Sequence, residues 1–159
     1  MPTNSTSATG KKADIRVTVQ YAVPRGGLPA ATRFRAWASA ALEQPAEVTL
    51  RIVDENEGRS LNHRYRGRDY ATNVLTFAYP EAEPLSGDIA LCAPVVAREA
   101  CAQSIALDAH YAHLTVHGLL HLQGYDHENE RDAEVMETRE SRIVQALGYA
   151  DPYGESGEA

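Results

Sequence analysis

The chain has 159 residues, of which 43% are hydrophobic and 23% are charged, and its formal net charge at pH 7 is −7. That length and composition predict one folded domain and exclude a chain that is disordered throughout. The negative net charge argues against a partner held by bulk electrostatic attraction, and the two cysteines exclude a disulfide framework and a four-thiolate metal site.

The ends of the chain differ in composition from its middle. Residues 1–12 lack the apolar stretch of a signal peptide, so we expect a disordered leader there. No apolar run approaches the ~20 residues needed to cross a bilayer. The cysteines are interpreted as reduced thiols, which predicts a cytoplasmic protein that does not enter a membrane. We expect one domain over residues 13–150 and a frayed tail over residues 151–159.

Periodicity in the sequence predicts the elements, because alternating apolar residues favour strands and apolar residues three and four apart favour helices. In chain order these are a strand at 15–20, a helix at 29–41, a strand at 48–52, a helix from Asp54 to Gly67, strands at 73–79 and 87–92, and helices at 95–105, 108–122 and 129–147. This order predicts a single α/β domain with a small, mixed, four-stranded sheet packed with about five helices.

Histidines gather between positions 110 and 127, where five of the chain's six occur. His117 and His121 are four residues apart, which puts two imidazoles on one face of a helix and suits a shared metal ion. Gly124 allows the chain to turn back, so that His127 closes the site. Three neutral nitrogen ligands leave a fourth position for water and predict a catalytic zinc site, while imidazole also suits nickel, copper and iron.

His113 lies one turn before His117 and competes with it as a ligand. We interpret His113 as a residue that supports a ligand or faces the substrate, because the turn at Gly124 brings His127, and not His113, towards the ion. His110 is expected at the surface.

Metzincin proteases share this ligand spacing, but they carry a glutamate after the first histidine as the general base. Here that position is Gly118, which has no carboxylate. The absence of the base argues against proteolysis. A peptidase or small-ester hydrolase that takes its base from Asp126 or Glu128 remains an alternative.

The segment HGLLHLQGYDH at 117–127 resembles the signature of the YbeY-type endoribonucleases, the rRNA maturation factors of bacteria. Further segments resemble the same family: LNHRYRGRDYATNVLTF at 61–77, GDIALC at 87–92 and METRESRIVQALGYADPY at 136–153. Together the segments cover most of residues 47–153. The chain departs from the family pattern at Ala71, where proline is usual, and at Thr76, where serine is usual.

The resemblance implies one zinc ion per chain on His117, His121 and His127, with a catalytic water on the ion and Arg66 facing it. It also implies cleavage of single-stranded RNA in 16S rRNA 3′-end maturation and in late quality control of the small ribosomal subunit. That subunit and its assembly proteins would then be partners in the cytoplasm. The alternative is a non-catalytic ribosome-assembly factor with a structural metal.

Further residues are candidates for contact with RNA. Arg66 belongs to an arginine-rich run, and its guanidinium fork matches phosphate oxygens. The other candidates are Arg59, Arg64 and Arg68 for neighbouring phosphates, and Tyr65 and Tyr125 for stacking on unpaired bases. Asp126, beside the last ligand, is expected to orient an imidazole, and relay of a proton or contact with the substrate are the alternatives. A solvated helix face and ordinary packing are the alternatives for the arginines and the tyrosines.

Overall fold

A computed structural model describes residues 14–154, so the leader expected at residues 1–12 lies outside the described residues. One mixed sheet contains β1 (Ile15–Tyr21), β2 (Ala46–Val53), β3 (Val74–Ala78) and β4 (Leu85–Cys92). The strand order is β1-β2-β4-β3. β1, β2 and β4 run parallel, whereas β3 lies at the edge and runs antiparallel to β4.

Five helices complete the fold of the described residues: α2 (Ala31–Ala41), α3 (Glu55–Arg66), α4 (Ala93–Gln103), α5 (Leu107–Leu122) and α6 (Glu130–Ala146). The structure confirms the predicted single α/β domain with a four-stranded mixed sheet. Helix and strand limits differ from the predicted ones by no more than two residues. No helix within residues 14–154 combines the length and the apolar character that crossing a membrane requires.

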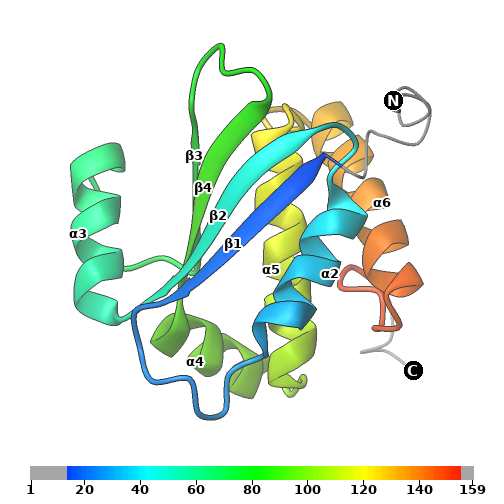
Figure 1. The fold of residues 1–159 in the computed structure, drawn as a ribbon. Coiled ribbons are helices and arrows are strands. Elements are labelled where there is room, and N and C mark those ends of the chain that lie inside the picture. Colours follow the sequence, from blue (N-terminus) through cyan, green and yellow to red (C-terminus); the bar gives the residue numbers. More distant parts are fainter. Residues whose placement is uncertain (1–13, 155–159) are drawn as a thin grey trace.

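The helices are divided between the two faces of the sheet (Figure 1). α2 and α5 cover one face, where α2 contacts β1 and α5 contacts β3 and β4. α6 packs on the outer side of α5, and α3 lies on the opposite face. Residues at the ends of α3 and α5 line one cavity together with residues of the edge strand β3.

α5 is the central helix of the molecule, and apolar side chains lie all around it, as is typical of a buried helix. Its buried apolar residues are Tyr111, Ala112, Leu114, Val116, Leu119, Leu120 and Leu122. Gly118 lets the helix approach the sheet closely, since a Cβ atom there would lie 3.1 Å from Ile89 Cδ1 and 3.3 Å from Thr76 Oγ1. The sheet therefore supports the helix that carries the histidines.

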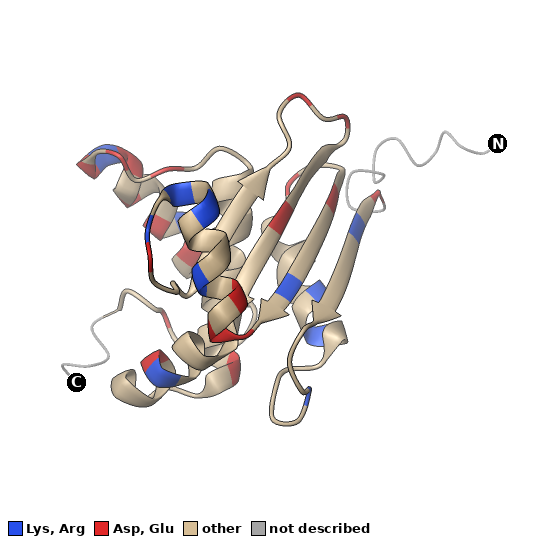
Figure 2. Ribbon diagram, turned by 90° about the vertical axis from the view of Figure 1, so that its left-hand side faces the viewer, with Lys and Arg blue, Asp and Glu red and all other residues tan. Residues whose placement is uncertain are grey.

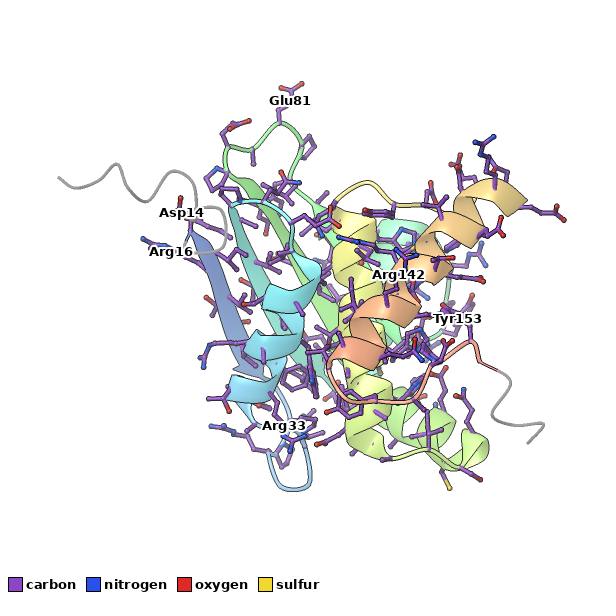
Figure 3. The ribbon with its side chains drawn as sticks, turned by 90° about the vertical axis from the view of Figure 1, so that its right-hand side faces the viewer. Asp14, Arg16, Arg33, Glu81, Arg142 and Tyr153 are labelled. Carbon is purple, nitrogen blue, oxygen red and sulfur yellow. The ribbon has the colours of Figure 1, made fainter. Side chains whose placement is uncertain are left out.

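The first residues of the expected tail pack against α6. Ser141 Oγ donates a hydrogen bond to Asp151 Oδ1 at 2.6 Å, and Tyr153 Oη donates one to Glu140 Oε1 at 2.6 Å. Figure 3 places the labelled Tyr153 beside α6. Residues 151–154 thus differ from the expectation of fraying because a buried carboxylate holds the Tyr153 hydroxyl; residues 155–159 lie outside the described residues.

Candidate metal centre

Three histidines converge where α5 ends. His117 and His121 come from the helix and His127 from the turn after it, and one ring nitrogen of each lies within 4.8 Å of the others. The Nε2 atoms of His121 and His127 are 3.2 Å apart. Two nitrogens on one tetrahedral zinc, each about 2.0–2.1 Å from the ion, lie about 3.3–3.4 Å apart. The spacing of the imidazoles therefore fits one shared ion.

The turn that brings His127 back is a Schellman motif. Gly124 has φ 102°, and its N–H donates to the His121 carbonyl at 3.0 Å, while the Tyr125 N–H donates to the Leu120 carbonyl at 3.0 Å. The Asp126 carboxylate then accepts a hydrogen bond from the His127 backbone N–H at 2.7 Å. In this structure Asp126 therefore supports the turn through the backbone of His127, whereas the sequence predicts a contact with an imidazole.

His113 is not one of these three imidazoles, and it pairs with Glu140 of α6. His113 Nε2 lies 2.9 Å from Glu140 Oε1, and His117 Nδ1 lies 2.5 Å from Glu140 Oε2. The Glu140 side chain is completely buried. Burial acts to raise its pKa, but hydrogen bonds from His113, His117 and Tyr153, with the charge of His117, outweigh burial and lower the pKa to about 2. His117 is thus shared between the triad and Glu140.

Two other histidines of α5 differ in their surroundings. His110 is buried, and its Nε2 atom lies 2.8 Å from Glu99 Oε1. The expectation of a surface position is wrong because α4, which carries Glu99, packs on this end of α5. The pKa of His121 lies below its ordinary value because burial disfavours the imidazolium and because His117 and His127 repel it. Neutral imidazole is the form that binds metal ions.

The triad opens into a cavity of about 620 Å³. Arg66, the last residue of α3, and Asp126 line the same cavity. Tyr65 and Phe77 form another wall, with their ring centroids 4.9 Å apart, and Tyr65 is 59% exposed. The end of α3, the strand β3, the end of α5 and the turn after it thus put an arginine, an exposed aromatic ring and three imidazoles around one space.

The other candidate arginines lie on or just after α3, along which Figure 2 shows several basic residues. Arg59 forms an ion pair with Asp69 at 2.8 Å, and Arg68 donates to the Tyr70 hydroxyl at 3.3 Å. Arg64 lies over the Tyr65 ring, 5.9 Å from its centroid. The residues that line the triad cavity include Arg66 but not these three.

Tyr125 also lies outside the triad cavity. Its ring packs against the hydrophobic core, and its hydroxyl donates to Glu43 Oε2 at 3.1 Å. Burial and this hydrogen bond raise the pKa of Tyr125. Of the two tyrosines that the sequence singles out, the structure brings only Tyr65 to the cavity.

Sequence reasoning missed Glu140 and its partner Tyr153. Glu140 lies four residues after Met136 and three before Ile143, both of which are buried. A carboxylate in an apolar stripe of a helix is buried only when it is paired, so the pattern was a usable signal. Tyr153 carries no such signal, because its contact depends on how the segment after α6 folds back.

The sequence of this chain matches a known family. Residues 30–148 match the family model described as Endoribonuclease YbeY. The chain belongs to this family. Proteins named Endoribonuclease YbeY are 61% identical over 139 residues in Methylobacillus flagellatus, 55% over 148 in Stenotrophomonas maltophilia and 52% over 150 in Nitrosomonas europaea. These matches cover 87%, 86% and 94% of this chain and 93%, 92% and 92% of the relatives.

A solved structure has a fold similar to that of this chain. The solution structure of TM1509 from Thermotoga maritima is similar to this chain with a TM-score of 0.58 and 23% sequence identity. The similarity covers 87% of this chain and 99% of that protein. At this level of identity the likeness concerns the arrangement of helices and strands alone.

Proposed function

We propose that the chain is a zinc-dependent endoribonuclease that cleaves single-stranded RNA. The observation that carries the proposal is the convergence of His117, His121 and His127 in a cavity that Arg66 also lines. The names of the relatives support an RNA substrate, since each is called an endoribonuclease.

The three imidazoles are the residues that would hold the ion, and the spacing of their nitrogens supports this assignment. When bound, a zinc ion on three imidazoles supplies a water of lowered pKa and a Lewis acid for a phosphate oxygen. Gly118 is buried against β3 and β4, so its lack of a carboxylate fits a site that uses no base at that position.

Arg66 and Tyr65 would hold the RNA. The Arg66 guanidinium presents parallel donors that match two phosphate oxygens, so it orients the scissile group and stabilises negative charge that develops on it. Tyr65, packed against Phe77 in a tilted arrangement and well exposed, offers a ring face to a base that has left its own stack. A base must be unpaired to reach this ring, which supports a preference for single strands.

We further propose that the substrate is small-subunit rRNA, cleaved in the cytoplasm during 16S 3′-end maturation and late quality control of the subunit. The small ribosomal subunit and its assembly proteins would then be partners. This part of the proposal is supported by the family resemblance of the segments around His117–His127 and residues 61–77.

The test is metal analysis of the purified chain together with RNA cleavage before and after chelation. We expect about one zinc per chain, cleavage of an end-labelled single-stranded RNA but not of its duplex, loss of cleavage on chelation and recovery with zinc. A chain that holds zinc but hydrolyses an unstructured protein and leaves RNA intact would instead be a different metallohydrolase.

A further inference from the structure

Glu140 is a charged residue of α6 that is buried where α6 packs on α5. Its side chain is completely buried and accepts hydrogen bonds from three residues on two segments of the chain: from His113 and His117 of α5 and from Tyr153 after α6. Taking a carboxylate out of water is costly, and three partners offset that cost. An apolar residue at this position would pack without such partners, so the carboxylate requires a further reason.

The contact with His117 gives that reason. Oε2 of Glu140 lies 2.5 Å from Nδ1 of His117, while Oε1 is held by His113 at 2.9 Å and by Tyr153 at 2.6 Å. An acceptor at this distance fixes the proton of His117 on Nδ1. Nε2 is then the ring nitrogen of His117 that is left to share an ion with His121 and His127.

We propose that Glu140 is the positioning residue of the metal centre, which sets the tautomer and the ring orientation of His117 and makes that imidazole a stronger ligand. His113 and Tyr153 hold the carboxylate in place from its other oxygen. The inference rests on the proposed zinc site, and it adds to that site a buried residue that lies outside the group of three imidazoles.

The first experiment compares zinc affinity, by competition with a chromogenic chelator, in the parent and in Glu140→Gln. The amide keeps the shape of the side chain but removes the charge and one acceptor, so we expect zinc affinity to fall about 10–100-fold, as for other outer partners of metal-bound histidines. Glu137→Gln is the matched control, because it removes the same charge from an exposed position on α6 and should leave the affinity at the parent value. Equal affinity in the parent and in Glu140→Gln overturns the proposal.

The second experiment needs no variant and therefore does not depend on how Glu140→Gln folds. In the zinc-loaded parent, ¹⁵N-resolved NMR should show a strongly downfield, slowly exchanging proton on Nδ1 of His117, with zinc bound through Nε2. A proton on Nε2 and zinc on Nδ1 overturns the proposal. A merely structural role of Glu140 would set no requirement on which ring nitrogen of His117 carries the proton.

These readouts separate the inference from the proposed function. A parent that binds zinc with the expected proton on His117 but leaves RNA intact contradicts the endoribonuclease activity and supports the role of Glu140. If the zinc-bound parent cuts RNA and Glu140→Gln binds zinc as tightly as the parent does, the endoribonuclease activity is supported and the role of Glu140 is contradicted. A parent that binds no zinc contradicts both.

Discussion

Single side chains of the same type have different roles in this chain because their partners differ. His113 lies against Glu140, His110 against Glu99, and His121 against His127. Helical spacing alone leaves these roles unresolved, since residues three and four apart share one face. The partner of each ring nitrogen decides whether the residue is able to bind an ion.

The ligand assignment makes a first prediction at this scale. His121→Ala should lose bound zinc, since it removes one of two ligands held on the rigid helix, whereas His113→Ala should keep about one zinc per chain. His113→Ala should lower the free energy of unfolding by roughly 1–3 kcal/mol, because buried Glu140 loses one of its partners. Metal analysis and thermal unfolding measure the two effects. If His113→Ala bound no zinc while His127→Ala still bound it, the ligands would be assigned wrongly.

Arg66 allows a second prediction. Arg66→Ala should slow RNA cleavage roughly 10²–10³-fold, by analogy with the loss of a single charge-stabilising donor, while zinc content and fold are retained. Arg66→Lys should also be slow, because it keeps the charge and loses the fork. Single-turnover cleavage of labelled RNA measures both, and Arg142→Ala, an exposed arginine on α6, is the matched control. Cleavage at the parent rate by both Arg66 variants would contradict this role of Arg66 and leave Arg59, Arg64 and Arg68 as candidates.

Among the elements, α5, which carries His117 and His121, is closely fitted to the sheet. A Cβ atom on Gly118 would be 3.1 Å from the buried Ile89, and one on Gly87 of β4 would be 2.4 Å from Leu122 Cδ1. Both glycines therefore allow close approach of the helix and the strands. The position that holds the general base of a metzincin protease faces the sheet in this chain.

Gly118→Glu is the prediction that follows for α5. The new carboxylate would enter the packed layer beside Ile89 and Thr76 without a partner, at a cost of roughly 3 kcal/mol or more. We expect the melting temperature to fall by roughly 6–12 °C and no peptidase to appear. Gly26→Glu is the control, since nothing lies within 4 Å of a Cβ atom there. Protein hydrolysis by a folded Gly118→Glu chain would revive the peptidase alternative.

The elements themselves could be predicted from the sequence because their signals are local. Alternation of apolar and polar residues indicated the strands. The helix expected to begin at Asp54 does begin there, because the Glu57 N–H donates a hydrogen bond to Asp54 Oδ1. Strand order and the sides taken by the helices depend on packing and had no local signal. The same limit applies to the candidate site. The three histidines of the triad lie within eleven residues, whereas Glu140 is 27 residues from His113 in the chain.

Across the whole molecule, the arginines are distributed in a way that limits electrostatic binding of RNA. Most of the ion pairs in the described residues lie at the surface, where they contribute little to stability but hold arginines beside acids. The arginines held in this way are Arg33, Arg51, Arg59, Arg98 and Arg139. The chain also carries a net charge of −7. Recognition should therefore depend on a few contacts at the cavity rather than on a broad basic surface.

The salt dependence of RNA binding tests this picture. For a single strand, the logarithm of the association constant falls with the logarithm of salt concentration at a slope of about −0.7 for each phosphate neutralised. If Arg66, with Arg64 beside Tyr65, makes the phosphate contacts, the slope should lie between about −0.7 and −1.4, and Arg66→Ala should make it shallower by about 0.7. Fluorescence anisotropy with a labelled oligoribonucleotide and chelated protein measures binding without cleavage. A slope steeper than about −3 would require at least four neutralised phosphates, and therefore a basic surface beyond this cavity.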